Sequence, residues 1–179
     1  MRETYPITIA GVKRELPRYA VSDSLDIAAF ILFGDVEITV AAAEALLKKA
    51  PAFDFILTPE AKSIPLAYEM ARQSGKPYVV ARKGVKVYMG SPVAVEVRSI
   101  TTQSTQHLYL GEDECNAIRG KRVLIIDDVI STGESLAAIR QLVKEAGAIE
   151  AGAGAVLAEG DAAGRKDIFY LEELPLFFK

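Results

Sequence analysis

The fold is decided by one stretch, Val123-Leu124-Ile125-Ile126-Asp127-Asp128-Val129-Ile130-Ser131-Thr132-Gly133-Glu134-Ser135. Its first four residues are apolar and β-prone, and they run directly into two adjacent carboxylates, which a loop of small residues soon follows. Beyond the loop, residues 136–143 carry apolar side chains at the spacing of a helix that packs by one face. The stretch therefore predicts a buried parallel strand, a tight loop and the N-terminus of a helix.

This predicted turn has the properties of an anion site. Unpaired backbone N–H groups and the positive end of the helix dipole hold anions, typically a phosphate. Asp127 and Asp128 fall at the end of the strand, which is the usual ligand edge of an open α/β sheet. Carboxylates would repel a phosphate unless they bind something else, either ribose hydroxyls or a Mg²⁺ ion. The stretch therefore predicts a site for a sugar phosphate.

The same block resembles the 5-phosphoribosyl-1-pyrophosphate (PRPP) motif of type I phosphoribosyltransferases, in which an apolar strand, two acids and two apolar residues precede a small-Thr-Gly loop. The alternative is a Rossmann-like strand end with two chance acids, which the length of the motif disfavours. The resemblance implies an α/β fold with a central, mostly parallel sheet flanked by helices, a small hood and a flexible β-hairpin lid. It implies that Asp127 and Asp128 are catalytic, binding the ribose hydroxyls and orienting Mg²⁺ through water. The residues that it assigns to the 5-phosphate are Ser131, Thr132, Gly133, Glu134 and Ser135.

The composition is that of a globular chain. Its 179 residues fit one domain with a full core, and half of them are hydrophobic while a quarter are charged. A net charge of −3 argues against a general nucleic-acid or membrane-surface binder. Cys115 is the only cysteine, so no internal disulfide is possible and a reducing cytoplasm is expected. No apolar run is long enough to span a bilayer.

Residues 1–34 differ in character from the rest. Residues 5–11 alternate like a strand, residues 13–19 are polar and contain a proline, and residues 25–33 are apolar. We expect a small irregular hood here, completed by the C-terminal tail, over a core of residues 35–172. In the resembling family this hood covers the nucleobase, which implies that Phe30 or Phe33 stacks on a purine. The alternative is that both aromatic side chains simply form the core of the hood.

The next part of the chain alternates helices and strands. We predict helices over residues 36–50 and 66–74, and strands over residues 54–58 and 77–81. The turn between the first strand and the second helix contains Lys62 and Ser63. It resembles the acid-small-Arg-Gly pyrophosphate loop of adenine phosphoribosyltransferases, with lysine and serine in place of arginine and glycine.

A basic cluster follows the second of these strands. It suits a pyrophosphate, since fixed cations stabilise the charge that builds on a leaving group. The residues that the resemblance assigns to pyrophosphate are Lys62, Arg82, Lys83 and Lys86. The alternatives are an ordinary β–α turn with a surface lysine and a solvated basic face.

Two further segments complete the predicted site. Residues 93–100 and 105–110 alternate, which predicts a hairpin with a hydroxyl-rich tip over residues 101–104, where the family carries its lid. This tip resembles the lid of bacterial xanthine phosphoribosyltransferases and of the purine repressor's effector domain. Glu159 follows a predicted strand over residues 149–158, at a place where family members often contact the base. The alternative for Glu159 is a solvated loop acid.

The resemblance implies purine salvage, with adenine and PRPP giving AMP and pyrophosphate in a homodimeric, Mg²⁺-dependent transferase. Xanthine is the second candidate base. Hypoxanthine-guanine enzymes carry an aspartate at the position of Ser131, and serine cannot handle the purine N7 proton as that aspartate does. A different class is a non-catalytic PRPP-sensing regulator, as in the purine repressor. An acidic chain without a helix-turn-helix signal disfavours that class and any nucleic-acid partner.

Overall fold

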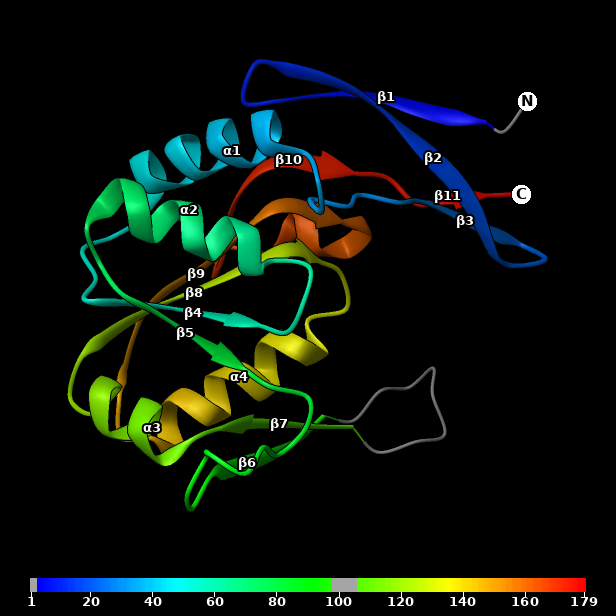
Figure 1. Ribbon diagram of the computed structural model, residues 1–179. Coiled ribbons are helices and arrows are strands. Elements are labelled where there is room, and N and C mark those ends of the chain that lie inside the picture. Colours follow the sequence, from blue (N-terminus) through cyan, green and yellow to red (C-terminus); the bar gives the residue numbers. More distant parts are fainter. Residues whose placement is uncertain (1–2, 98–105) are drawn as a thin grey trace.

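The computed structural model describes residues 3–97 and 106–179, and its centre is a five-stranded sheet in which every neighbouring pair is parallel. In spatial order the strands are β10 (Phe169–Leu174), β9 (Ile149–Glu159), β8 (Arg122–Ile130), β4 (Phe55–Pro59) and β5 (Tyr78–Ala81). In Figure 1 the carboxyl ends of β4 and β5 point to the right-hand side of the molecule. All loops that leave these ends therefore meet at one edge.

Helices cover both faces of this sheet (Figure 1). On one face lie α1 (Val36–Lys49) and α2 (Ile64–Ser74), and on the other lie α3 (Glu112–Ile118) and α4 (Glu134–Glu145). Because successive side chains of a strand point to opposite faces, and helices cover both faces, the central strands are mainly apolar. Leu124 packs with the α1 and α2 side and Ile125 with the α4 side, and both are almost fully buried. Burial of such a side chain contributes about 1.5–3 kcal/mol.

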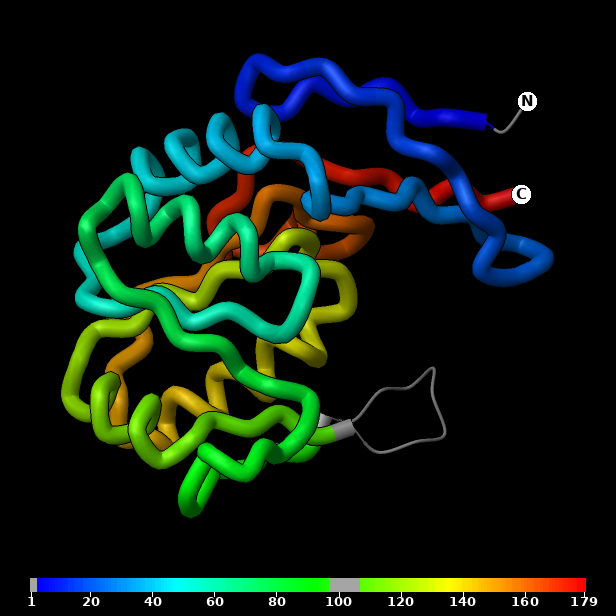
Figure 2. The backbone as a smooth tube through the Cα atoms, in the orientation of Figure 1, coloured from blue at the N-terminus to red at the C-terminus, as the bar shows by residue number. Residues whose placement is uncertain are grey.

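A second sheet forms the hood. It consists of β1 (Thr4–Ile9), β2 (Val12–Ser22), β3 (Leu25–Ala28) and β11 (Phe177–Phe178), all paired antiparallel. Figure 2 shows that the start and the end of the chain both reach this sheet. The hood stands beside the carboxyl edge of the main sheet (Figure 1).

The hood is more regular than the sequence indicated, because residues 12–22 form one continuous strand instead of an irregular segment. Pro17 does not interrupt it. Pro17 pairs with Thr4 at the last position of the β1–β2 ladder, and Arg18 opens the β2–β3 ladder opposite Ala28. The missing N–H of proline therefore falls where β2 changes partner, which is a position that tolerates it.

A hairpin of β6 (Val93–Val97) and β7 (Gln106–Leu110) flanks the other side of the same edge. Val95 and Leu108 bury it in the apolar cluster that also contains the α4 side chains. Arg82 and Tyr109 exchange two backbone hydrogen bonds of 2.8 Å, which join the hairpin to the end of β5. The expected lid tip over residues 101–104 lies outside the described residues.

Helix α3 has no counterpart among the elements that the sequence predicted. The helix has seven residues, of which Cys115 and Ile118 are buried. Two apolar positions are too few to display a helical period. No helix in the described part of the chain has the length and apolar character needed to cross a membrane.

Candidate active site

The site lies where the order of the strands reverses: β5 is added on one side of β4, whereas β8, β9 and β10 are added in turn on its other side. Strands β4 and β8 are parallel neighbours, but α2 follows β4 on one face and α4 follows β8 on the other. Loops that diverge in this way leave a crevice outside the carboxyl ends of the strands. A cavity of about 420 Å³ lies there, and its walls include Lys62, Ser63, Lys83, Asp127, Asp128 and Ser135. We call it the acid-pair cavity.

The two carboxylates differ in their surroundings. Asp128 is 3 % exposed, and its Oδ2 lies 2.9 Å from Lys62 Nζ. The two groups form an ion pair, but their angle does not suit a hydrogen bond. No other described residue donates a hydrogen bond to Oδ2. Asp127 is half-buried and accepts a 2.8 Å hydrogen bond from the Asp128 backbone N–H. Burial, and then the charge of Asp128, raises the pKa of Asp127 well above its ordinary value.

The loop that carries Lys62 is held by buried hydroxyl groups. Thr58 Oγ1 donates a 2.8 Å hydrogen bond to Ser63 Oγ, which donates one of 3.2 Å to the Pro59 carbonyl. Ser63 is also the N-cap residue of α2, with a φ of −89°. Its backbone therefore does not need the freedom of the glycine that stands there in the resembling loop. The peptide bond between Glu60 and Ala61 is cis.

The structure separates the basic residues that the sequence grouped together. Arg82 Nε lies 3.2 Å from Glu60 Oε2, and its Nη1 donates a 2.9 Å hydrogen bond to the Tyr88 hydroxyl. A 2.9 Å hydrogen bond from the Lys83 backbone N–H, followed by the Arg82 guanidinium, lowers the pKa of Glu60. Lys62 and Lys83 line the acid-pair cavity, whereas Arg82 and Lys86 are not among the residues of its wall.

The loop after β8 has the geometry of an anion site. Gly133 is the N-cap residue of α4 and adopts a φ of +83°, a conformation that side chains other than glycine rarely adopt. The first N–H groups of α4, which have no partner within the helix, follow directly at Glu134 and Ser135. Ser131 and Thr132 are exposed beside them. The predicted phosphate residues therefore form one loop around a helix N-terminus.

A second cavity, of about 340 Å³, lies under the hood and shares two wall residues with the first. Its walls include Phe30, Ile31, Lys62, Val129, Ser131 and Glu159, and we call it the hood cavity. Lys62 and Val129 line both cavities. Phe30 is 5 % exposed, whereas Phe33 is 54 % exposed and does not belong to the wall. The structure therefore brings Phe30 and Glu159 together and leaves Phe33 apart.

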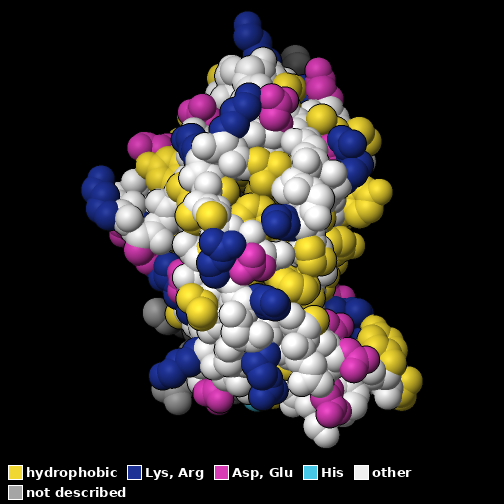
Figure 3. All heavy atoms as spheres, turned by 90° about the vertical axis from the view of Figure 1, so that its left-hand side faces the viewer, with side chains coloured by type: hydrophobic (Ala, Val, Ile, Leu, Met, Phe, Trp, Pro, Cys, Tyr) yellow, Lys and Arg dark blue, Asp and Glu magenta, His cyan; other side chains and the backbone are white. Residues whose placement is uncertain are grey.

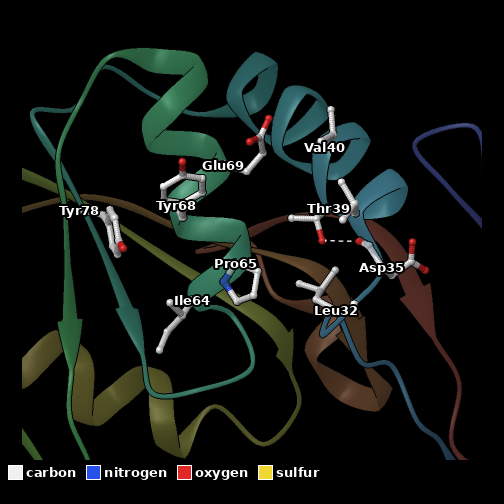
Figure 4. A pocket seen from close by; sticks show the side chains of 11 residues that line it. Leu32, Asp35, Thr39, Val40, Ile64, Pro65, Tyr68, Glu69 and Tyr78 are labelled. Carbon is white, nitrogen blue, oxygen red and sulfur yellow. Dashed lines mark hydrogen bonds between the residues drawn. The ribbon is translucent and has the colours of Figure 1, made fainter.

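An apolar groove of about 430 Å³ lies elsewhere, against α1 and α2 (Figure 4). Its carboxylates are already engaged, since Asp35 pairs with Arg14 and Glu69 with Arg72, each at 2.7 Å. The groove carries none of the acid-pair residues. Figure 3 views the left-hand side of Figure 1, and acidic and basic side chains are interspersed there. The candidate site residues therefore lie in the acid-pair cavity at the carboxyl edge of the sheet and not in this groove.

One residue that the sequence analysis did not single out lies beside the loop at residues 131–135. A Cβ atom built on Gly133 would overlap Nη1 of Arg165, so this guanidinium lies directly against the loop. Arg165 follows the short 3₁₀ helix η1 (Gly160–Gly164) after β9, 32 positions beyond Gly133 by subtraction of their residue numbers. The sequence gives one indirect indication of such a residue: residues 131–135 contain no lysine or arginine, so a cation at this loop must come from another segment.

Comparisons with known proteins bear on the family and the fold of this chain. The phosphoribosyl transferase domain family matches residues 36–174. A hypoxanthine/guanine phosphoribosyltransferase of Methanothrix thermoacetophila is 36% identical over 113 residues, which cover 63% of this chain and 55% of that protein. A xanthine phosphoribosyltransferase of Exiguobacterium sp. is 34% identical over 113 residues, covering 63% of this chain and 58% of that protein. The chain spans about half the length of the curated relatives it matches.

Solved structures share the architecture. An adenine phosphoribosyltransferase from Thermoanaerobacter pseudethanolicus superposes with a TM-score of 0.67 at 23% identity, over 96% of this chain and 95% of that chain. The enzyme of the same name from Saccharomyces cerevisiae gives a TM-score of 0.71 at 22% identity, over 88% and 92% of the two chains. The α/β fold predicted from the sequence is therefore confirmed.

Proposed function

Because this chain belongs to the phosphoribosyl transferase domain family, we propose that it transfers the phosphoribosyl group of PRPP to a purine base and releases pyrophosphate. The observation that carries the proposal is that two cavities of different chemistry lie side by side, with Lys62 and Val129 in the walls of both. The acid-pair cavity offers carboxylates, cations and a helix N-terminus, which suit a charged sugar phosphate. The hood cavity offers an aromatic side chain and few charges, which suit a planar base.

The acid pair binds and orients the ribose in this proposal. Asp128 is buried at the strand end, so its carboxylate accepts hydrogen bonds from the ribose hydroxyls at a fixed position. The pair also fits Mg²⁺, since carboxylates are hard oxygen ligands and Oδ2 of Asp128 lacks an aligned hydrogen bond from the described residues. When bound, the ion would neutralise charge on the pyrophosphate oxygens. The loop at residues 131–135 holds the 5-phosphate at the opposite end of the sugar.

The transfer breaks the bond between C1 of the ribose and a pyrophosphate oxygen. The transition state resembles the sugar cation of glycoside hydrolysis, and the electron pair of the broken bond leaves with pyrophosphate. Lys62 and Lys83 stabilise that growing negative charge from the wall of the cavity. A purine nitrogen then forms the new bond to C1 and loses its proton to solvent or to pyrophosphate. The hood positions the base for this attack.

Adenine is the first candidate base. The two solved structures compared above carry the name adenine phosphoribosyltransferase. Ser131, in the wall of the hood cavity, is a small residue, as the resemblance implies for the adenine and xanthine branches. Xanthine is the second candidate, which the xanthine phosphoribosyltransferases among the curated relatives support. Hypoxanthine and guanine belong in the same assay because further relatives carry those names.

The test is turnover of PRPP and Mg²⁺ with adenine, xanthine, hypoxanthine and guanine in turn, with monophosphate formation as the readout. The Asp128→Asn variant, purified in parallel, is the control for contaminating transferases of the expression host. AMP formation by the wild type and not by the variant would support the adenine assignment. XMP formation would select the xanthine branch. Tight PRPP binding without turnover of any base would contradict the catalytic proposal and favour a sensor.

A further inference from the structure

The loop of the proposed 5-phosphate site has no cationic side chain of its own. A phosphate monoester carries a charge of about −1.5 to −2 at neutral pH, whereas a helix N-terminus supplies roughly +0.5. The loop at residues 131–135 contains no lysine or arginine. Lys62 and Lys83 line the cavity of the acid pair, where the proposed function assigns them to the pyrophosphate. A cation from another segment would therefore raise the affinity of this loop for a phosphate considerably.

Arg165 is placed to supply this cation. Its Nε and Nη2 bind the two oxygens of Asp167 at 3.0 and 2.7 Å, which fixes the plane of the guanidinium. The remaining nitrogen, Nη1, lies against Gly133. Within the described part of the chain, Nη1 donates no hydrogen bond to a protein acceptor. The side chain is 30% exposed, so a ligand at the loop has access to it.

The guanidinium is also tied to the helix that forms the site. Asp167 accepts a 2.6 Å hydrogen bond from Nη1 of Arg140, and the Asp167 carbonyl accepts one of 3.2 Å from Nη2. Arg140 belongs to α4 and is itself anchored to Glu150 on β9 at 3.0 Å. The cation and the helix N-terminus are thus held in one frame, and little side-chain entropy remains to be lost when a phosphate binds.

We propose that Arg165 is a 5-phosphate-binding residue, with Nη1 donating a charge-assisted hydrogen bond to the phosphate that the loop at residues 131–135 holds. The inference rests on the proposed function and deepens it. It also gives Gly133 a second role: its φ of +83° permits the turn, and its missing side chain makes room for Nη1. A hydrogen bond of this charged kind corresponds to about a 10- to 100-fold change in affinity.

The test compares Arg165→Met with Lys166→Met, which removes the same charge from the adjacent, exposed position. Calorimetry measures the binding of ribose 5-phosphate and of Mg²⁺-pyrophosphate to each purified protein. We expect Arg165→Met to weaken ribose 5-phosphate about 10- to 100-fold and to leave pyrophosphate affinity unchanged. Lys166→Met should match the wild type with both ligands. Arg165→Lys should recover part of the loss, because it retains the charge without the two-point hold on Asp167.

Four outcomes would overturn the inference. Wild-type affinity for ribose 5-phosphate in folded Arg165→Met would remove Arg165 from the site and leave the proposed function standing. Equal losses for ribose 5-phosphate and pyrophosphate would indicate a purely structural role. Failure of the wild type itself to bind ribose 5-phosphate would remove the phosphate site and the proposed function together. If Arg165→Met does not fold, Arg165→Lys with wild-type affinity for both ligands would also contradict the inference.

Discussion

Replacing Asp128 by asparagine tests the centre of the proposed site with a change of almost no volume. Asp128 is 3 % exposed at the end of β8, and its Oδ2 lies 2.9 Å from Lys62 Nζ. Asparagine keeps the shape and one acceptor oxygen but loses the negative charge. The perturbation therefore separates the charge of the carboxylate from its role in packing.

The structure sets the size of both expected effects. A hydrogen bond to a charged acceptor contributes about 1.5–3 kcal/mol, so its loss to the ribose hydroxyls predicts about 10- to 150-fold weaker PRPP binding. The free energy of unfolding should stay constant or rise. A buried charge is removed beside Asp127, and the ion pair given up is weak because the Lys62 side chain is 52% exposed and solvent screens it. Loss of binding without loss of stability is typical of a functional carboxylate.

The assay pairs PRPP binding by calorimetry with urea unfolding of the same preparations. Asp23→Asn, at an exposed turn of the hood, makes the same chemical change away from the site and should match the wild type in both measurements. A folded Asp128→Asn protein that binds PRPP as tightly as the wild type would refute the ribose assignment. A large fall in its unfolding free energy would refute the argument that Asp128 serves binding instead of stability.

Three further predictions follow from the packing and the charges. Phe30→Leu should raise KM for the base about 2- to 10-fold, because an aromatic wall is lost, while Phe33→Leu should leave KM unchanged in the same assay. The pKa of Asp54 is held well below its usual range by hydrogen bonds from its arginine partner at the start of β8, so the pair stabilises the fold above about pH 4 and loses this effect as the pH falls. Asp54→Asn should accordingly lower the urea midpoint at pH 7, and the difference from the wild type should shrink in acid. Gly154→Ala should lower the free energy of unfolding by about 1–3 kcal/mol, because the added Cβ meets the Phe169 ring on the neighbouring strand, and Phe169→Leu in the same chain should restore part of it.

Each of these predictions has an outcome that contradicts its reasoning. Equal KM changes for Phe30→Leu and Phe33→Leu would mean that the hood cavity does not hold the base. A pH-independent difference for Asp54→Asn would show that the loss arises from packing and not from charge. A Gly154→Ala protein of wild-type stability would show that the Phe169 ring has room to move.

The strand–loop–helix unit at residues 123–135 was determined by the sequence alone. A run of apolar residues that ends in two acids, followed by a glycine and an amphipathic stretch, specifies its structure locally. The same local logic predicted α1, α2 and four strands of the main sheet, β4, β5, β8 and β9, and hence the α/β class, but it predicted no strand at the position of β10. It missed α3, whose short sequence has no period, and the regular pairing of β2, which depends on two partner strands.

The tertiary structure alone decided which of the polar residues meet. The sequence analysis assigned four basic residues alike to pyrophosphate. In the structure Arg82 contacts Glu60 and Tyr88, whereas Lys62 pairs with Asp128. Likewise Phe30 lines the hood cavity, whereas Phe33 is not among the residues of its wall. Arg165 reaches Gly133 because the order of strands places the loop after β9 beside the loop after β8. Local sequence determines whether a segment forms a helix or a strand. The partners of its side chains are set by neighbours that are distant in the chain and adjacent only in the folded sheet.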